Sequence, residues 1–152
     1  MRATRPRFAP GYGIATDDEG MLSWEWALER LAASRNYWIS TVHPDGRPHA
    51  MPVWGVVVDG TLHFGTNPSS AKGRNLARSG ELVAHTESGD ECVILEGVVE
   101  RVPRTAAVAD AYAAKYDWRP EEGGEVYAVR PHVAYAWRER DYPRSATRFV
   151  PE

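Results

Sequence analysis

The chain has 152 residues, of which 43% are hydrophobic, and a formal net charge of -3. This length suits one domain with its own core, and the acidic balance excludes the overall basic field that attracts nucleic acid. No apolar run approaches the ~20 residues of a membrane-spanning helix, and residues 1–13 lack the apolar segment of a secretory signal. We therefore expect a soluble cytoplasmic protein with neither nucleic acid nor a membrane as a partner.

The sequence predicts neither an internal disulfide nor a metal site. Cys92 is the single cysteine, and because it lies in the strand-like run CVILEGVV, we expect a buried, unreactive thiol. No H-x-x-H or H-E-x-x-H pattern occurs among the five histidines, so no metal is predicted.

The first 20 residues are rich in proline, glycine and acidic side chains, which predicts an extended arm. We therefore divide the chain into an arm over residues 1–20 and a domain over residues 21–152. Ser23 is a suitable N-cap for a helix that runs to about Ala33.

Short strands dominate the domain. We expect strands at residues 37–42, 49–58, 61–66, 81–87, 91–102, 126–130 and 133–137, the last two interrupted by Pro131, and an edge strand in the tail over residues 143–150. Two further helices are expected at residues 69–79 and 105–116. Because turns join the strands, the pattern favours a mainly β, antiparallel sheet closed or folded on itself, with peripheral helices. No G-x-G-x-x-G follows a strand, which argues against a doubly wound nucleotide-binding fold.

Asp59-Gly60 predicts a type I′ turn at the centre of a hairpin. With these two loop residues, Val58 pairs with Thr61 and Val56 with His63. Side-chain alternation then predicts two faces. The core-facing set is Val53, Gly55, Val57, Leu62 and Phe64, and the opposite set is Trp54, Val56, Val58 and His63. The same register places His49 and His63 on opposite sides of the sheet.

Pro52, Gly55 and Gly65 are unusual residues for such strands. Two interpretations stay open: a flat ligand lies against this strand, or the strand is bulged and Trp54 covers Gly65.

The helix expected at Ser69–Ser79 has Lys72 and Arg74 near its start and no acid beside them. Helix N-termini favour negative charge, so this arrangement indicates a bound anion such as phosphate. The alternative is an ordinary helix with a solvated basic face.

These motifs, in order, suggest a family. The H-P-D-G-R-P turn, P-V-W-G strand, D-G turn, F-G-T strand and A-K-G-R-N-L helix resemble the pyridoxamine-phosphate-oxidase-like split β-barrel family, and within it the flavin/deazaflavin oxidoreductases common in actinobacteria. The run V-I-L-E-G-V-V-E-R-V and the closing A-Y-A-W and S-A-T-R-F segments also resemble that group. The resemblance covers roughly residues 22–150.

The resemblance implies a six-stranded antiparallel split β-barrel of the FMN-binding type, forming a homodimer with cofactor sites at the interface. The cofactor would be coenzyme F420 or, as the alternative, FMN. Its ring would lie along the backbone of Met51, Pro52, Val53, Trp54 and Gly55. Its phosphate end would be held by Thr66, Ser69, Ser70, Lys72 and Asn75, with Arg74 as a further helper.

The chain also departs from the family pattern. Many relatives carry an arginine one or two residues before the lysine, where this chain has Ser70 and Ala71, so the phosphate grip is weaker or another residue completes it. The C-terminal arginine and histidine pattern of true pyridoxamine phosphate oxidases is absent, so oxidation of vitamin B6 is not expected.

The function expected on this basis is transfer of hydride from reduced F420 to a small electron-poor substrate. The alternatives are an FMN-dependent oxidoreductase and a non-catalytic protein that binds a flavin or haem-type ring. No catalytic acid is assigned, although His49 is a candidate because it lies beside the expected cofactor strand.

Overall fold

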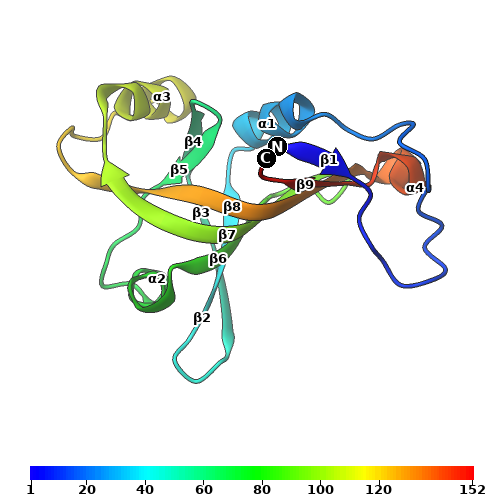
Figure 1. Ribbon diagram of the computed structural model, residues 1–152. Helices are drawn as coiled ribbons and strands as arrows, with labels where there is room; N and C mark the ends of the chain where they lie inside the picture. The colour runs from blue at the N-terminus through cyan, green and yellow to red at the C-terminus, as the bar shows by residue number, and fades with distance from the viewer.

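One antiparallel sheet of nine strands organises the whole chain, residues 1–152, in a computed structural model (Figure 1). The strands are β1 (Arg2–Thr4), β2 (Tyr37–Val42), β3 (Pro48–Val53), β4 (Gly55–Val58), β5 (Thr61–Phe64), β6 (Glu81–Thr86), β7 (Glu91–Pro103), β8 (Glu125–Arg138) and β9 (Thr147–Val150). The helices are α1 (Trp24–Ala33), α2 (Ala71–Ser79), α3 (Ala106–Tyr116), the 3-10 turn η1 (Glu139–Asp141) and α4 (Tyr142–Ser145).

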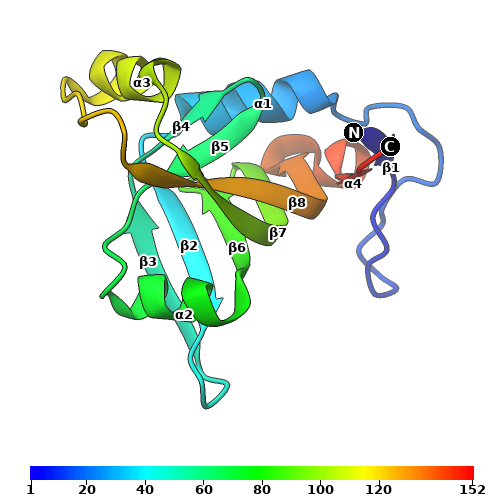
Figure 2. The same cartoon turned by 60° about the vertical axis from the view of Figure 1, so that its left-hand side comes forward.

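The sheet follows the order β1-β9-β8-β7-β6-β2-β3 and curls without closing. One edge of β8 pairs with β7 along its length. The other edge pairs with β5 near the N-terminal end of β8 and with β9 near its C-terminal end. α2 packs against β2 and β3, whereas α1 and α3 contact β4 at the other end of the barrel (Figure 2). The predicted mainly β split-barrel fold with peripheral helices is therefore confirmed.

The strand count differs from the six of the expected barrel for identifiable reasons. The predicted strand 49–58 breaks at Trp54, because β3 pairs with β2 while β4 turns away to pair with β5. Two short strands, β1 and β9, also extend the sheet beyond the barrel.

The hairpin between β4 and β5 has the predicted register. Val58 pairs with Thr61 and Val56 pairs with His63. Leu62 and Phe64 lie in the main core, as predicted for their face. Val56 is buried too, on the other face, because α3 covers it and adds a second core cluster there.

The strand break predicted at Pro131 is wrong. β8 runs without interruption, and the register shifts opposite Glu96 and Gly97, so that His132 is an extra, bulged residue. A Cβ on Gly97 would lie 2.1 Å from the Arg130 carbonyl oxygen, so only glycine permits this close pairing.

The first residues also join the fold more closely than an extended arm would. β1 pairs with β9, which brings the two termini together (Figure 1). Arg5 then fixes the following loop, since its guanidinium donates hydrogen bonds to the carbonyl oxygens of Asp17, Glu19 and Ala146.

Two local expectations, the cap of α1 and the burial of Cys92, are confirmed. Ser23 caps α1 by accepting a hydrogen bond from the Trp26 amide at 3.1 Å. Cys92 is buried and free, and burial raises the pKa of its thiol to about 11. No helix combines the length and the apolar character needed to cross a membrane.

Candidate functional site

The start of α2 is shaped by a tight loop over residues 66–70. Ser70 caps the helix by accepting a hydrogen bond from the Gly73 amide at 3.0 Å, and its hydroxyl lies 3.3 Å from that of Thr66. The loop packs directly on the helix, because a Cβ on Gly73 would lie 2.4 Å from the Asn67 carbonyl oxygen. Thr66 and Ser70 are thus brought together, with Ser69 exposed beside them, and Gly73, which the sequence did not single out, makes this close packing possible.

Lys72 is a buried cation without a carboxylate. The residue is 8% exposed, it takes part in none of the ion pairs of the protein, and no acid lies in the first turn of α2. Burial lowers the pKa of its ammonium group. Burying a charge without a partner costs stability, so an anion near the start of α2 would be favoured.

Asn75 and Arg74 have other partners. Asn75 is 4% exposed, and its amide donates a hydrogen bond to the Thr41 hydroxyl at 3.0 Å, which holds α2 against β2. Arg74 is exposed on the helix and donates to the carbonyl oxygen of Ser69. Asn75 therefore positions α2, and Arg74 braces the loop.

Of the predicted ring-binding residues, Met51, Pro52 and Val53 lie on β3 at an edge of the sheet, whereas Gly55 is buried in β4, which pairs with β5. β3 is the last strand in the sheet order, which agrees with the presence of Pro52. Met51 and Trp54 are both largely exposed there. The strand therefore offers backbone and side chains to a ligand.

The two glycines of the hairpin have different roles. Gly55 is required by internal packing, since a Cβ there would lie 3.0 Å from the Tyr37 ring and 2.9 Å from the His63 carbonyl oxygen. Gly65 has no atom within 4 Å of a Cβ position. Trp54 does not cover it, but stacks on Tyr116 with ring centroids 4.4 Å apart and an interplanar angle of 5°.

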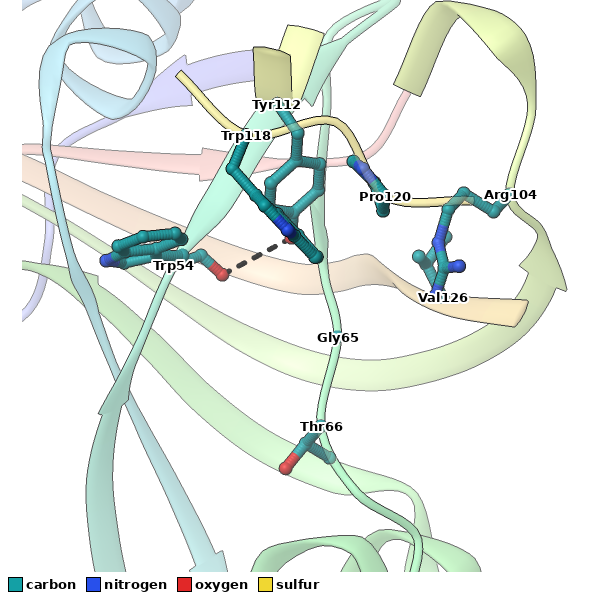
Figure 3. Close-up of a pocket in the computed structure, with 8 residues that line it drawn as sticks. All are labelled: Trp54, Gly65, Thr66, Arg104, Tyr112, Trp118, Pro120 and Val126. Carbon is teal, nitrogen blue, oxygen red and sulfur yellow. Dashed lines mark hydrogen bonds between the residues drawn. The ribbon is translucent and has the colours of Figure 1, made fainter. Parts of the chain in front are cut away.

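A cavity of about 340 Å³ opens between this strand and α3 (Figure 3). Its lining consists of Trp54, Gly65, Thr66, Arg104, Tyr112, Trp118, Pro120 and Val126. Only Trp54 and Thr66 were predicted as site residues. Gly65 follows β5 and Val126 lies on β8, whereas Arg104, Tyr112, Trp118 and Pro120 come from α3 and its flanking loops. No motif in the sequence linked that helix to the hairpin.

Two side chains of α3 hold the strand break in place. The Tyr116 hydroxyl accepts a hydrogen bond from the Gly55 amide at 2.9 Å, and Lys115 donates one to the Gly55 carbonyl oxygen at 2.9 Å. Burial, and secondarily Arg35, lower the pKa of Lys115 to about 8. The backbone groups at the break are thus satisfied by side chains instead of by a neighbouring strand.

His49 lies beside His43, with ring centroids 5.1 Å apart, and not beside His63. Its Nδ1 is buried without a hydrogen-bond partner. Burial, then His43 and Lys72, lower the pKa of its imidazole, so the ring is neutral at pH 7. No cluster of three or more histidine, cysteine or acidic side chains is placed to hold a metal ion.

A family model described as pyridoxamine 5'-phosphate oxidase matches residues 24–138, which is most of the chain. The chain belongs to this family. The match spans β2 to β8 with α1, α2 and α3, and therefore includes both the start of α2 and the aromatic cavity.

Solved structures of this family show the same fold. The conserved hypothetical protein Rv2991 from Mycobacterium tuberculosis is 23% identical, with a TM-score of 0.70 over 83% of this chain and 91% of that one. A protein named F420 reductase is 23% identical, with a TM-score of 0.57 over 70% of this chain and 93% of that one. A heme binding protein from Mycobacterium smegmatis is 22% identical, with a TM-score of 0.59 over 82% of this chain and 61% of that one.

Proposed function

We propose that the protein is an oxidoreductase that binds a phosphate-bearing flavin-type cofactor, the deazaflavin F420, and reduces a small electron-poor substrate. The observation that carries this proposal is Lys72, a buried cation without an acidic partner at the start of α2. Membership of the pyridoxamine 5'-phosphate oxidase family and the likeness to a protein named F420 reductase support it.

The residues at the start of α2 fit a phosphate group. Lys72 would supply the positive charge, while the hydroxyls of Thr66 and Ser69 would donate hydrogen bonds. The Ser70 hydroxyl already donates to the Asn67 carbonyl oxygen at 2.7 Å, so Ser70 would shape the loop around the phosphate. The free amides of the first turn of α2 would add to these donors. Asn75 would keep the helix in register with β2, and Arg74 would hold the loop that carries Ser69.

The edge strand over residues 51–53, together with Trp54, would support the ring. When bound, the cofactor supplies hydride chemistry, and the protein supplies position and a dry environment. The backbone from Met51 to Trp54 would orient the ring, and the Trp54 indole would exclude water from one end of it. His49, neutral and with Nδ1 unpartnered, is the side chain we assign to proton exchange near the ring.

Catalysis is favoured over simple binding because space remains beside the expected ring position. The cavity of about 340 Å³ next to Trp54 is large enough for a small substrate. A protein that only stores a flavin or a haem would be expected to seal that space. FMN is the alternative cofactor, since the same residues would hold its phosphate.

We also propose a homodimer with the cofactor at the interface. The outer side of the sheet exposes Trp38 and Val42 on β2, which point to the same face. Exposed apolar side chains grouped in this way are typical of an interface. Sedimentation of the purified protein at micromolar concentration should give twice the mass of the chain.

The proposal is tested by titrating the apo-protein with F420 and, separately, with FMN, and following tryptophan fluorescence. We expect saturable binding of F420 and a loss of affinity of about tenfold to a hundredfold in Lys72→Met, the range for one charge-assisted contact. Arg47→Ala is the control, because Arg47 is exposed and paired with Asp45. Binding of neither cofactor, or equal binding by Lys72→Met, would contradict the proposal.

A further inference from the structure

The cavity of Figure 3 combines an aromatic end with a charged end. In that view Trp54 lies at one end, Arg104 lies beside Val126 at the other, and Tyr112, Trp118 and Pro120 lie between them. Trp118, Pro120 and Arg104 take no part in the proposed grip on the cofactor. Cofactor binding therefore does not explain why these three side chains line the cavity.

Aromatic side chains form the walls of this cavity. Tyr112 and Trp118 stand almost perpendicular, at 87° with ring centroids 6.1 Å apart, and Trp118 lies 6.5 Å from Trp54. Tyr112 is buried, and its hydroxyl donates a hydrogen bond to the Trp54 carbonyl oxygen at 3.5 Å, so this wall is fixed. Trp118 is 52% exposed and leaves an apolar face available to a ligand.

The charged end is supplied by Arg104. Its guanidinium donates hydrogen bonds to the carbonyl oxygens of Glu121 at 2.7 Å and Glu125 at 3.3 Å. Both partners are backbone atoms, and no carboxylate pairs with it, because the Glu125 side chain pairs with Arg101 instead. Arg104 is therefore held in place while its charge remains unneutralised.

These features indicate which kind of ligand the cavity would bind. Arginine binds carboxylates through parallel hydrogen bonds in one plane, and aromatic walls favour flat rings. A cavity of about 340 Å³ accommodates a small ring system with one acidic group. We propose that this cavity binds a flat aromatic carboxylate, with its ring against Trp118 and Tyr112 and its carboxylate on Arg104.

This inference rests on the proposed function in one respect. Trp54 and Thr66 belong both to this cavity and to the expected cofactor site, so an aromatic acid bound here would lie next to the ring, in the position of a substrate. Binding itself depends only on the residues of the cavity and can be measured without a cofactor.

The test uses the full-length apo-protein, calorimetric titration and two probes of equal shape, 2-naphthoate and the neutral 2-naphthamide. We expect 2-naphthoate to bind about tenfold or more tightly than the amide, the range for a hydrogen bond to a charged group. Arg104→Met should abolish this preference, whereas Arg101→Met, which removes the neighbouring ion-paired arginine, should preserve it. Trp118→Leu should weaken both probes.

The ratio of the two affinities separates a charge effect from a distorted loop, because distortion at residues 121–125 would weaken both probes alike. An unchanged preference in Arg104→Met, no preference in the wild type, or no binding of 2-naphthoate would overturn the proposal. So would displacement of 2-naphthoate by F420, since the cavity would then belong to the cofactor.

Failure of the proposed function gives a different pattern. If Lys72→Met loses F420 binding but keeps 2-naphthoate binding, both proposals stand. If no cofactor binds and 2-naphthoate still distinguishes Arg104→Met from the wild type, the aromatic-acid site stands without the redox proposal.

Discussion

The Lys115 ammonium group donates a hydrogen bond to the Tyr37 hydroxyl across 2.7 Å and lies 4.7 Å from the centroid of that ring. The Tyr37 hydroxyl in turn donates to the Leu31 carbonyl oxygen. This chain of contacts joins α3, β2 and the last turns of α1 beneath the strand break at Trp54. These contacts also stabilise the wall of the aromatic cavity next to Trp54, because Lys115 donates a further hydrogen bond to the Gly55 carbonyl oxygen.

The first prediction concerns pH and Lys115. Its pKa is about 8 in the folded protein and 10.5 ordinarily, so above pH 8 the unfolded chain holds more protons at this group than the folded one. Stability from Lys115 should therefore rise as the pH increases from 8 toward 10.5. Thermal unfolding of the wild type and Lys115→Met across pH 7–9.5 checks this.

The comparison with Lys115→Met is necessary because other groups act in the opposite direction. Cys92 and Tyr112 have raised pKa values of about 11 and 12, so their contributions to stability are lost above their ordinary values of 9.0 and 10.0. We expect the melting temperature of the wild type, relative to that of Lys115→Met, to increase with pH. A constant difference would contradict the assigned burial of Lys115.

A second prediction separates binding from stability at Lys72. Replacing this buried, unpaired cation by methionine removes a desolvation cost, so Lys72→Met should raise the melting temperature of the apo-protein, by about 2–4 °C for each kcal/mol gained. The same change should weaken binding of the cofactor. Differential scanning fluorimetry with and without F420 measures both. A lower melting temperature of the apo-variant would mean that Lys72 has a partner that stabilises its charge.

Local sequence signals predicted much of the fold. Ser23 caps α1, and the turn at Asp59-Gly60 sets the register of β4 and β5. These features depend on residues close together in the chain, where propensity and hydrogen bonding decide the structure. The break at Trp54 escaped the same reasoning, because it arises from contacts of Gly55 with Lys115 and Tyr116, about 60 residues later.

The residues of the candidate site also fall into two groups, those that local sequence signals indicate and those that only long-range packing brings together. Lys72 could be predicted, since a cation at a helix start is a local signal. The loop before it is longer than predicted, because β5 ends at Phe64 and α2 begins at Ala71. Arg104 and Trp118 could not be predicted, because only the packing of α3 against β4 brings them to the hairpin. Asn75 shows the reverse case, since the family resemblance implied a ligand contact while the fold turns its side chain toward Thr41.

A third prediction compares two glycines near the start of α2. In Gly73→Ala the new Cβ would meet the Asn67 carbonyl oxygen at 2.4 Å and Pro68 at 2.9 Å, so the loop must shift. We expect a loss of about 1–3 kcal/mol in the free energy of unfolding, together with weaker binding of the cofactor. Gly65→Ala is the matched control, because no atom lies within 4 Å of its Cβ position. Urea denaturation of both variants gives the comparison, and equal stabilities would show that the loop does not pack on Gly73.

The last prediction concerns the Tyr116 hydroxyl. It accepts a hydrogen bond from the Gly55 amide at 2.9 Å and donates one to the Arg35 carbonyl oxygen at 2.7 Å. Tyr116→Phe keeps the ring that stacks on Trp54 but leaves the buried Gly55 amide without its partner, at a cost of about 1–3 kcal/mol. Hydrogen exchange at the Gly55 amide should accelerate by about one to two orders of magnitude, as that cost implies. Tyr135→Phe, on the outer side of β8, should leave the exchange rate unchanged. If Tyr116→Phe leaves the Gly55 amide as protected as in the wild type, the Tyr116 hydroxyl is not the group that holds the strand break.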